Sequence, residues 1–280
     1  LFELTAIVIS ACILTYSLFV NGGTYDERVH INHGIVFWRT AQPDFDPMHP
    51  PLVSIFAFPL RLFYDIPLPK EPEDPLPSGK LGKRVLTRCR SIALIVFLSF
   101  AWAFGRIATR WMGVLPGYIA LLLMLFEPTF GSHAYLVTTD PLFTYTSFLL
   151  LAASYEWVLK PTWIRTCALG AALGLVLLAK FTAPLWIAGV AAGLAVFVAA
   201  DARCCRTQRL WQKEEQWRIL GLRMVQVLTA TIFALFLLAM VYRFEGIGTP
   251  LRSLELGEHG LGPATRLMEW FPSPVPRKYL

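Results

Sequence analysis

Residues 224–242 read MVQVLTATIFALFLLAMVY, an apolar stretch that contains no charged side chain. About 20 consecutive apolar residues are needed to cross the hydrocarbon core of a bilayer. Across the whole chain 55% of the residues are hydrophobic and 16% are charged, whereas soluble domains carry about 25% charged residues. The charges gather between long apolar stretches. The sequence therefore predicts an integral membrane protein.

Further apolar segments of about span length precede this stretch. They are residues 4–20, 91–108, 111–126, 141–159 and the run 166–200, which is too long for one helix. Lys180 and Pro184 interrupt that run, so we divide it into two spans. The expected fold class is all-α: a polytopic membrane protein of about seven transmembrane helices. Residues 91–108 and 111–126 should form a tight helical pair around Arg106 and Arg110.

Lysine and arginine in short loops set the orientation of a membrane protein. Basic residues within 106–110, 160–165 and 203–223 fall on one side, which we expect to be cytoplasmic. Residues 201–223 are rich in Arg, Lys, Glu and Trp and predict a basic amphipathic segment on the inner leaflet. Because most basic residues flank apolar segments, the net charge of +6 does not indicate nucleic-acid binding.

The long loop of residues 21–90 should then face outward, on the periplasmic side of a plasma (inner) membrane. Basic residues between 80 and 90 crowd its end and favour the opposite orientation, but long loops are largely exempt from the charge rule. Within the loop, apolar residues at helical spacing predict a helix over 25–40. Residues 52–64 predict a short helix in the membrane interface, and the Pro/Glu/Lys-rich residues 67–82 predict a mobile excursion.

The sequence DERVH, residues 26–30, directly follows the first span. On a helix Asp26, His30 and His33 share a face, because they lie at positions i, i+4 and i+7. Two adjacent carboxylates, Asp26 and Glu27, beside histidines at a membrane surface suit general-base catalysis. The alternative is a solvated helix start, since acids in a first turn favour the helix dipole. The motif alone does not decide between them.

The same motif differs from the zinc-protease sequence H-E-x-x-H only in its first residue. That sequence needs both histidines on one helix and a third ligand. Asp26 replaces the first histidine and breaks the pattern. We therefore assign no metal ligand from this motif.

Other candidate groups lie in the outer loop and at the outer ends of predicted spans. His49 stands among prolines that fix its backbone, and Asp140 precedes the span 141–159. Each has a structural alternative, namely a Pro-rich turn and a helix N-cap. Arg90 and Lys180 are cations whose burial in lipid costs roughly 2.5 to 3.5 kcal/mol, and snorkelling explains either one singly. Two cations together with acids on one leaflet predict a site for an anionic lipid headgroup.

These motifs occur in a recognisable order. The sequence has D-E-x-x-H at 26–30, H-P-P-L at 49–52, an Arg opening the second span, T-T-D-P at 138–141 and G-x-x-x-x-x-K-x-T-A at 174–183. The set resembles the GT-C membrane glycosyltransferases, specifically the protein O-mannosyltransferase and aminoarabinose-transferase branch (glycosyltransferase family 39). The resemblance runs to about residue 184 and continues more weakly beyond.

The resemblance implies that residues 1–280 are a GT-C-like transmembrane domain with 21–90 as its outer catalytic loop. Such enzymes are usually longer, and this chain begins without Met, so we expect the domain to be partial. They invert the sugar as they move it from a polyprenyl-phosphate donor to a hydroxyl of a protein or lipid acceptor on the outer face. Carried over, Asp26 is the base that deprotonates the acceptor, with Glu27 beside it.

The remaining site residues follow from the same resemblance. Arg90, and with it Lys180 and His49, would hold the departing lipid phosphate, because cationic donors match phosphate oxygens. His30 and Asp140 would shape the pocket. The polyprenyl-phosphate sugar is a donor substrate and not a cofactor. The resemblance does not decide whether the enzyme also needs a divalent cation. Membrane lipid, the lipid-linked donor and the acceptor are the expected partners.

Three other functions compete with this one. A non-catalytic scaffold subunit of a larger membrane complex would keep the fold without needing costly charges at 26, 90 and 180. A transporter would predict charges near mid-span and an internal repeat, and the sequence shows neither. A metal-dependent protease has the broken motif described above. The glycosyltransferase is our leading hypothesis.

Overall fold

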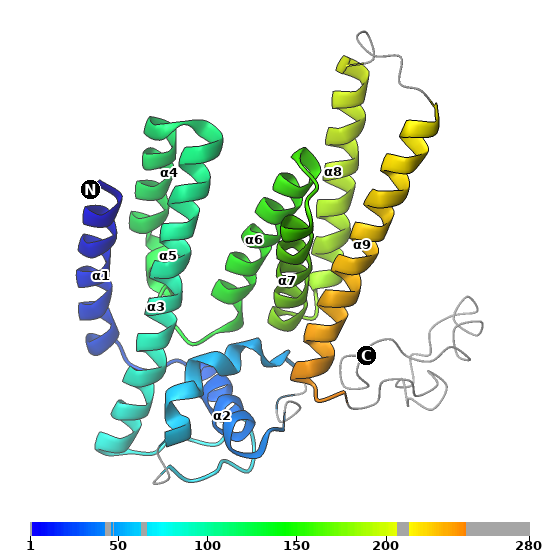
Figure 1. The fold of residues 1–280 in the computed structure, drawn as a ribbon. Helices are drawn as coiled ribbons and strands as arrows, with labels where there is room; N and C mark the ends of the chain where they lie inside the picture. The colour runs from blue at the N-terminus through cyan, green and yellow to red at the C-terminus, as the bar shows by residue number, and fades with distance from the viewer. Residues whose placement is uncertain (1, 43–45, 47, 63–65, 206–212, 245–280) are drawn as a thin grey trace. The chain divides into compact units, whose positions relative to one another are not determined.

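The computed structural model describes residues 2–42, 46, 48–62, 66–205 and 213–244, and every regular element within them is a helix (Figure 1). The chain divides into two compact units, Leu1–Tyr145 and Thr146–Leu280. The first unit contains the predicted outer loop and most of the candidate site residues.

Four helices in the described part of the chain are long and apolar enough to cross a membrane. They are α1 (Phe2–Val20), α3 (Gly79–Met112), α6 (Thr139–Leu159) and the Gly221–Val241 part of α9 (Lys213–Val241). Among the shorter apolar helices are α4 (Val114–Phe126), α7 (Trp163–Ala179) and the Ala183–Phe197 part of α8 (Ala183–Cys205). The protein is thus a membrane protein whose described part is all-helical, and the count of about seven spans remains a prediction.

The second long helix differs from the prediction at both ends. α3 begins at Gly79, well before the apolar stretch that starts at residue 91. Lysine and arginine are good helix formers, so the basic residues continue the helix instead of ending it. The chain reverses at Gly113, whose φ of 92° suits a residue without a Cβ. The predicted helical pair is confirmed, because α4 packs against α3. The predicted position of the turn is wrong, because Arg106 and Arg110 both lie within α3.

The outer loop is a packed part of the first unit. The predicted helix over 25–40 is confirmed as α2 (Tyr25–Thr40), and the short apolar segment forms the 3-10 helix η1 (Pro51–Leu62). Buried side chains join these two elements to α3 and to the start of α6; among them are Ile31, Ile35, Phe56, Leu60, Val85 and Leu142. Gly34 allows the close approach of α2 and η1, since a Cβ there would lie 2.3 Å from the Ala57 Cβ.

The Pro-rich segment that follows η1 is tied to α2. The buried Asn32 side chain donates hydrogen bonds from Nδ2 to the carbonyl oxygens of Pro72 (3.0 Å) and Asp74 (2.7 Å). The Asp74 carboxylate in turn accepts the backbone N–H groups of Lys70 and Glu71. These bonds fix the segment where the sequence predicted an excursion.

In the second unit α7 packs against α9 through small residues. A Cβ on Gly170 would lie 2.8 Å from the Ala230 carbonyl oxygen, and one on Gly174 would lie 3.0 Å from the Leu237 side chain. Small residues let membrane helices approach closely. The predicted break at Lys180 is confirmed, because α7 ends at Ala179 and α8 begins at Ala183. The predicted amphipathic segment 201–223 includes residues 206–212, which lie outside the described residues.

Candidate functional site

The first turn of α2 is fixed by a capping box. Thr24 is the N-cap, and its hydroxyl accepts the backbone N–H of Glu27 at 3.3 Å. The Glu27 carboxylate accepts the backbone N–H of Thr24 at 3.0 Å. This reciprocal pair satisfies N–H groups that have no partner within the helix. Asp26 lies in this fixed turn, and its side chain is exposed.

Glu27, by contrast, is fully buried and binds Arg90. The Arg90 Nε donates to Glu27 Oε1 at 2.7 Å, and Nη2 donates to Oε2 at 2.7 Å. Both side chains have no exposed surface. Glu27 Oε1 also accepts the Val137 backbone N–H at 3.3 Å. The two acids that adjoin in sequence therefore differ in role: Glu27 holds the fold together, and Asp26 faces outward.

Arg90 donates its other N–H groups to carbonyl oxygens at the end of α1 and just after it. Nη1 donates to the carbonyl oxygens of Asn21 (2.7 Å) and Leu18 (3.3 Å), and Nη2 donates to that of Gly22 (2.7 Å). Leu18 is in the last turn of α1, whose final carbonyls lack partners within the helix, and Asn21 and Gly22 directly follow it. Arg90 therefore provides donors to the end of α1 and to the start of the loop. A guanidinium has five N–H donors, and the five bonds to protein acceptors use them all. Arg90 therefore has no N–H group left to donate to a phosphate, the contact that the resemblance implies for it, because Glu27 and the end of α1 occupy its side chain.

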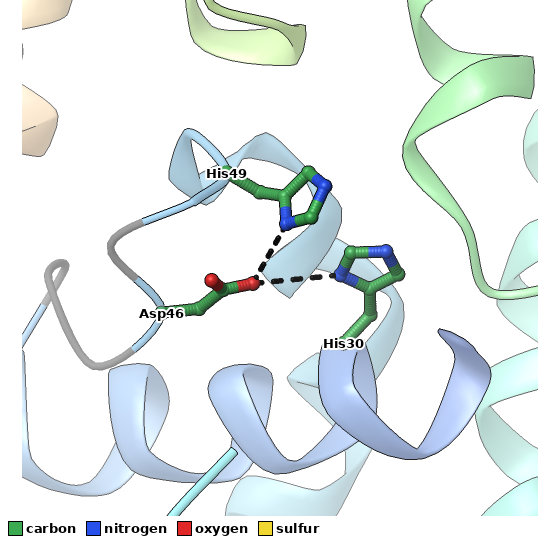
Figure 2. A group of neighbouring side chains, drawn as sticks. All are labelled: His30, Asp46 and His49. Atoms are coloured by element: carbon green, nitrogen blue, oxygen red, sulfur yellow. Dashed lines mark hydrogen bonds and ion pairs between the residues drawn. The ribbon is translucent and has the colours of Figure 1, made fainter. Parts of the chain in front are cut away.

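His30, Asp46 and His49 meet in the same unit (Figure 2). His30 extends from α2, whereas Asp46 and His49 come from the chain just before η1. The Asp46 Oδ2 atom lies 3.0 Å from His49 Nδ1 and 3.9 Å from His30 Nδ1. The two imidazole rings meet edge to face, with centroids 4.8 Å apart. His30 and Asp46 are buried, and the His49 side chain is 34% exposed.

Burial and hydrogen bonds together set the charges in this cluster. Burial lowers the pKa of His30 to about 4, and His49 acts in the same direction, so His30 is neutral at pH 7. Burial also opposes ionisation of Asp46. Hydrogen bonds from His49 and from the Met48 backbone N–H outweigh that effect and hold the pKa of Asp46 below its ordinary value. The cluster thus contains a buried carboxylate beside a buried neutral imidazole.

The remaining predicted residues lie apart from these contacts. Asp140 is exposed in the first turn of α6 and helps to line an open hollow of about 230 Å³ beside α5 (Pro128–His133). The Asp140 charge also acts to raise the pKa of His30, against the larger lowering by burial. Lys180 follows α7 and belongs to the second unit. The predicted convergence of Lys180 with Asp26 and Arg90 therefore stays a prediction.

Asp46 is the member of the cluster to which the sequence motifs assigned no role. The signal was its position three residues before His49 in DPMHPPL, which lets a carboxylate turn back onto the imidazole. A scan against protein-family models found no match, and searches of curated proteins and of solved structures found no similar protein. The function proposed for the chain thus depends on its own residues.

Proposed function

We propose that this protein is an inverting glycosyltransferase that moves a sugar from a polyprenyl-phosphate donor to a hydroxyl of a protein or lipid acceptor. It would span the plasma membrane about seven times and act on the outer side. The observation that carries the proposal is the exposed Asp26 carboxylate, which lies in a turn fixed by Thr24 and Glu27 just beyond α1. A base at this position can reach an acceptor and a lipid-linked donor at the membrane surface.

The proposed reaction is a single displacement in which one bond forms and one breaks at the anomeric carbon. Asp26 removes the proton of the acceptor hydroxyl while the oxygen attacks the anomeric carbon. The bond between that carbon and the donor phosphate breaks, and the phosphate leaves with the electron pair. A positioned general base contributes about 10² to 10⁴ in rate. Rigid placement matters because misplacement by 1 Å can cost about a hundredfold. The capping box and the Glu27–Arg90 pair supply that rigidity.

The leaving phosphate needs positive charge, and stabilising it is usually the largest catalytic effect. Because Glu27 and α1 occupy Arg90, we assign Arg90 to positioning the turn that bears Asp26. Lys180 and His49 stay the proposed phosphate contacts, and His30 and Asp140 stay the proposed pocket residues. Arg90 is thus a structural cation in the proposed site, whereas Lys180 and His49 would contact the donor phosphate.

One observation favours a second function, a non-catalytic scaffold subunit of a larger membrane complex. The ion pair of Glu27 with Arg90 is buried and saturated, so these two charges have a structural use whether or not catalysis occurs. A scaffold could retain them for that reason alone. Asp26 distinguishes the two functions, because its exposed carboxylate has no such structural use in the capping box.

The test is sugar transfer in membranes that contain the protein and a polyprenyl-phosphate sugar. Asp26→Asn should lower the transfer rate by about 10² to 10⁴ at normal expression. Glu73→Gln is the matched control, because Glu73 is an exposed acid of the same loop. It should transfer at the wild-type rate. An Asp26→Asn rate equal to wild type would reject the base, and a wild-type protein inactive with a panel of lipid-phosphate sugars would favour the scaffold.

A further inference from the structure

We propose that His30, Asp46 and His49 form a binding site for a divalent transition-metal ion of the zinc type. One ligand atom from each residue lies within 4.8 Å of the other two. Imidazole nitrogens and carboxylate oxygens are the ligands that zinc prefers beside thiolate. The site shares His30 and His49 with the proposed transferase pocket, where a bound ion would replace the direct contact of His49 with phosphate. Metal binding itself requires neither donor nor acceptor, so it is tested without them.

The distances suit an ion between the three side chains. A tetrahedral zinc ion with bonds of about 2.0 to 2.2 Å places its ligand atoms roughly 3.3 to 3.6 Å apart. Asp46 Oδ2 lies 3.0 Å from His49 Nδ1 and 3.9 Å from His30 Nδ1, on either side of that range. Figure 2 shows one ring nitrogen of His30 and one of His49 directed at the same Asp46 carboxylate oxygen. Small rotations of the side chains would bring all three atoms around one ion.

One buried nitrogen of the cluster lacks the partner that burial usually demands. The His30 Nδ1 atom is buried and has no hydrogen-bond partner among the residues that the structure describes. The Asp46 carboxylate is also buried, and within the described part of the chain its ion pairs are with the two histidines. Buried charges are normally paired or bound to a metal. A cation here would accept the lone pair of His30 and compensate the charge of Asp46.

The surroundings of Asp46 leave one oxygen available for an ion. The Met48 backbone N–H donates to Asp46 Oδ1 at 2.9 Å, which fixes the carboxylate and leaves Oδ2 facing the histidines. Such supporting bonds orient ligands in metal sites. The partly exposed His49 gives the site an opening toward solvent. Three protein ligands leave a fourth position for water or an anion, as in catalytic zinc sites.

The competing explanation is a hydrogen-bonded Asp46–His49 pair that never holds a metal. In that case His49 carries the proton between its Nδ1 and Asp46, at the observed 3.0 Å. The two explanations differ in what zinc does. A metal site binds one ion per chain and depends on both residues, whereas a simple pair gives no saturable zinc binding.

The experiment uses the full chain purified in detergent, stripped with a chelator and titrated with Zn²⁺ by calorimetry. The wild type should bind one zinc ion, and Co²⁺ should give the visible absorption of a four-coordinate site. His49→Ala and Asp46→Asn should each weaken zinc binding more than about tenfold. His133→Ala should bind zinc like the wild type, because His133 is exposed and lies outside the cluster.

Elution as a single species in size-exclusion chromatography shows that each variant is folded. His49 is the decisive position, because its partial exposure makes loss of folding on truncation a small risk. Zinc affinity in His49→Ala equal to that of wild type, or no saturable binding by the wild type, would overturn the site. Either result leaves the Asp26 transfer assay unaffected, so the two proposals fail separately.

Discussion

Arg90 and Glu27 form a bidentate ion pair in which both N···O distances are 2.7 Å and neither side chain is exposed. The residues are 63 positions apart in the chain. Removing two charges from water costs several kcal/mol each, and good geometry with further hydrogen bonds must offset that cost. The bonds from Arg90 to the end of α1, and those to Glu27 from Thr24 and Val137, meet this requirement.

Breaking this pair should destabilise the protein strongly. Glu27→Gln leaves the Arg90 charge buried without its counter-ion, which costs about 3 to 5 kcal/mol in comparable pairs. The free energy of unfolding of the detergent-solubilised protein measures the loss. The matched control is Glu156→Gln, because Glu156 binds Arg165 at 2.9 Å with both side chains more than a fifth exposed. That pair should contribute about 1 kcal/mol or less. Equal losses for the two variants would contradict the structural role of Glu27.

The contact of α2 with η1 should not tolerate a methyl group at Gly34. A Cβ there would lie 2.3 Å from the Ala57 Cβ, so Gly34→Ala must push the two elements apart. Overpacking of this kind costs about 1 to 3 kcal/mol. Gly189→Ala in α8 is the control, since no atom lies within 4 Å of a Cβ added there. Thermal unfolding should separate the two variants, and an unchanged midpoint for Gly34→Ala would show that the elements are not in this contact.

The buried His30 should make the metal-free protein less stable in acid. Unfolding returns the pKa of His30 from about 4 to its ordinary value of 6.5. Between these two pKa values the unfolded state binds a proton that the folded state does not bind. The free energy of unfolding therefore falls as the pH drops below 6.5. Between pH 7 and pH 5 this amounts to about 2 kcal/mol. Unfolding measured with a chelator present should show a smaller pH dependence for His30→Gln, and identical slopes would mean that His30 titrates normally in the folded protein.

Local sequence patterns predicted what depends on neighbours in the chain. Apolar spacing gave the bounds of α2, and the capping residue Thr24 with Glu27 three positions later explains where that helix begins. Hydropathy failed to find the start of α3, because basic residues are polar and yet form helix readily. It located the α3–α4 turn poorly as well, since Gly113 and not the nearby arginines allows the reversal.

Contacts between residues far apart in the chain could not be predicted from the sequence patterns. Nothing in the pattern pairs Arg90 with Glu27 in preference to Asp26, because the two acids adjoin and only packing decides which one is buried. The convergence of His30 with Asp46 and His49 likewise requires α2 and η1 to pack together. The motifs named residues with the right chemistry, and the fold divided them between structural and candidate functional roles.

The most direct measurement compares Asp26→Asn with Glu27→Gln in two assays, sugar transfer from a polyprenyl-phosphate donor and stability toward unfolding. If Asp26 performs the chemistry and Glu27 holds the turn, Asp26→Asn loses transfer by about a hundredfold or more and unfolds like the wild type. Glu27→Gln should lose several kcal/mol of stability. Transfer by Asp26→Asn at the wild-type rate would contradict the account.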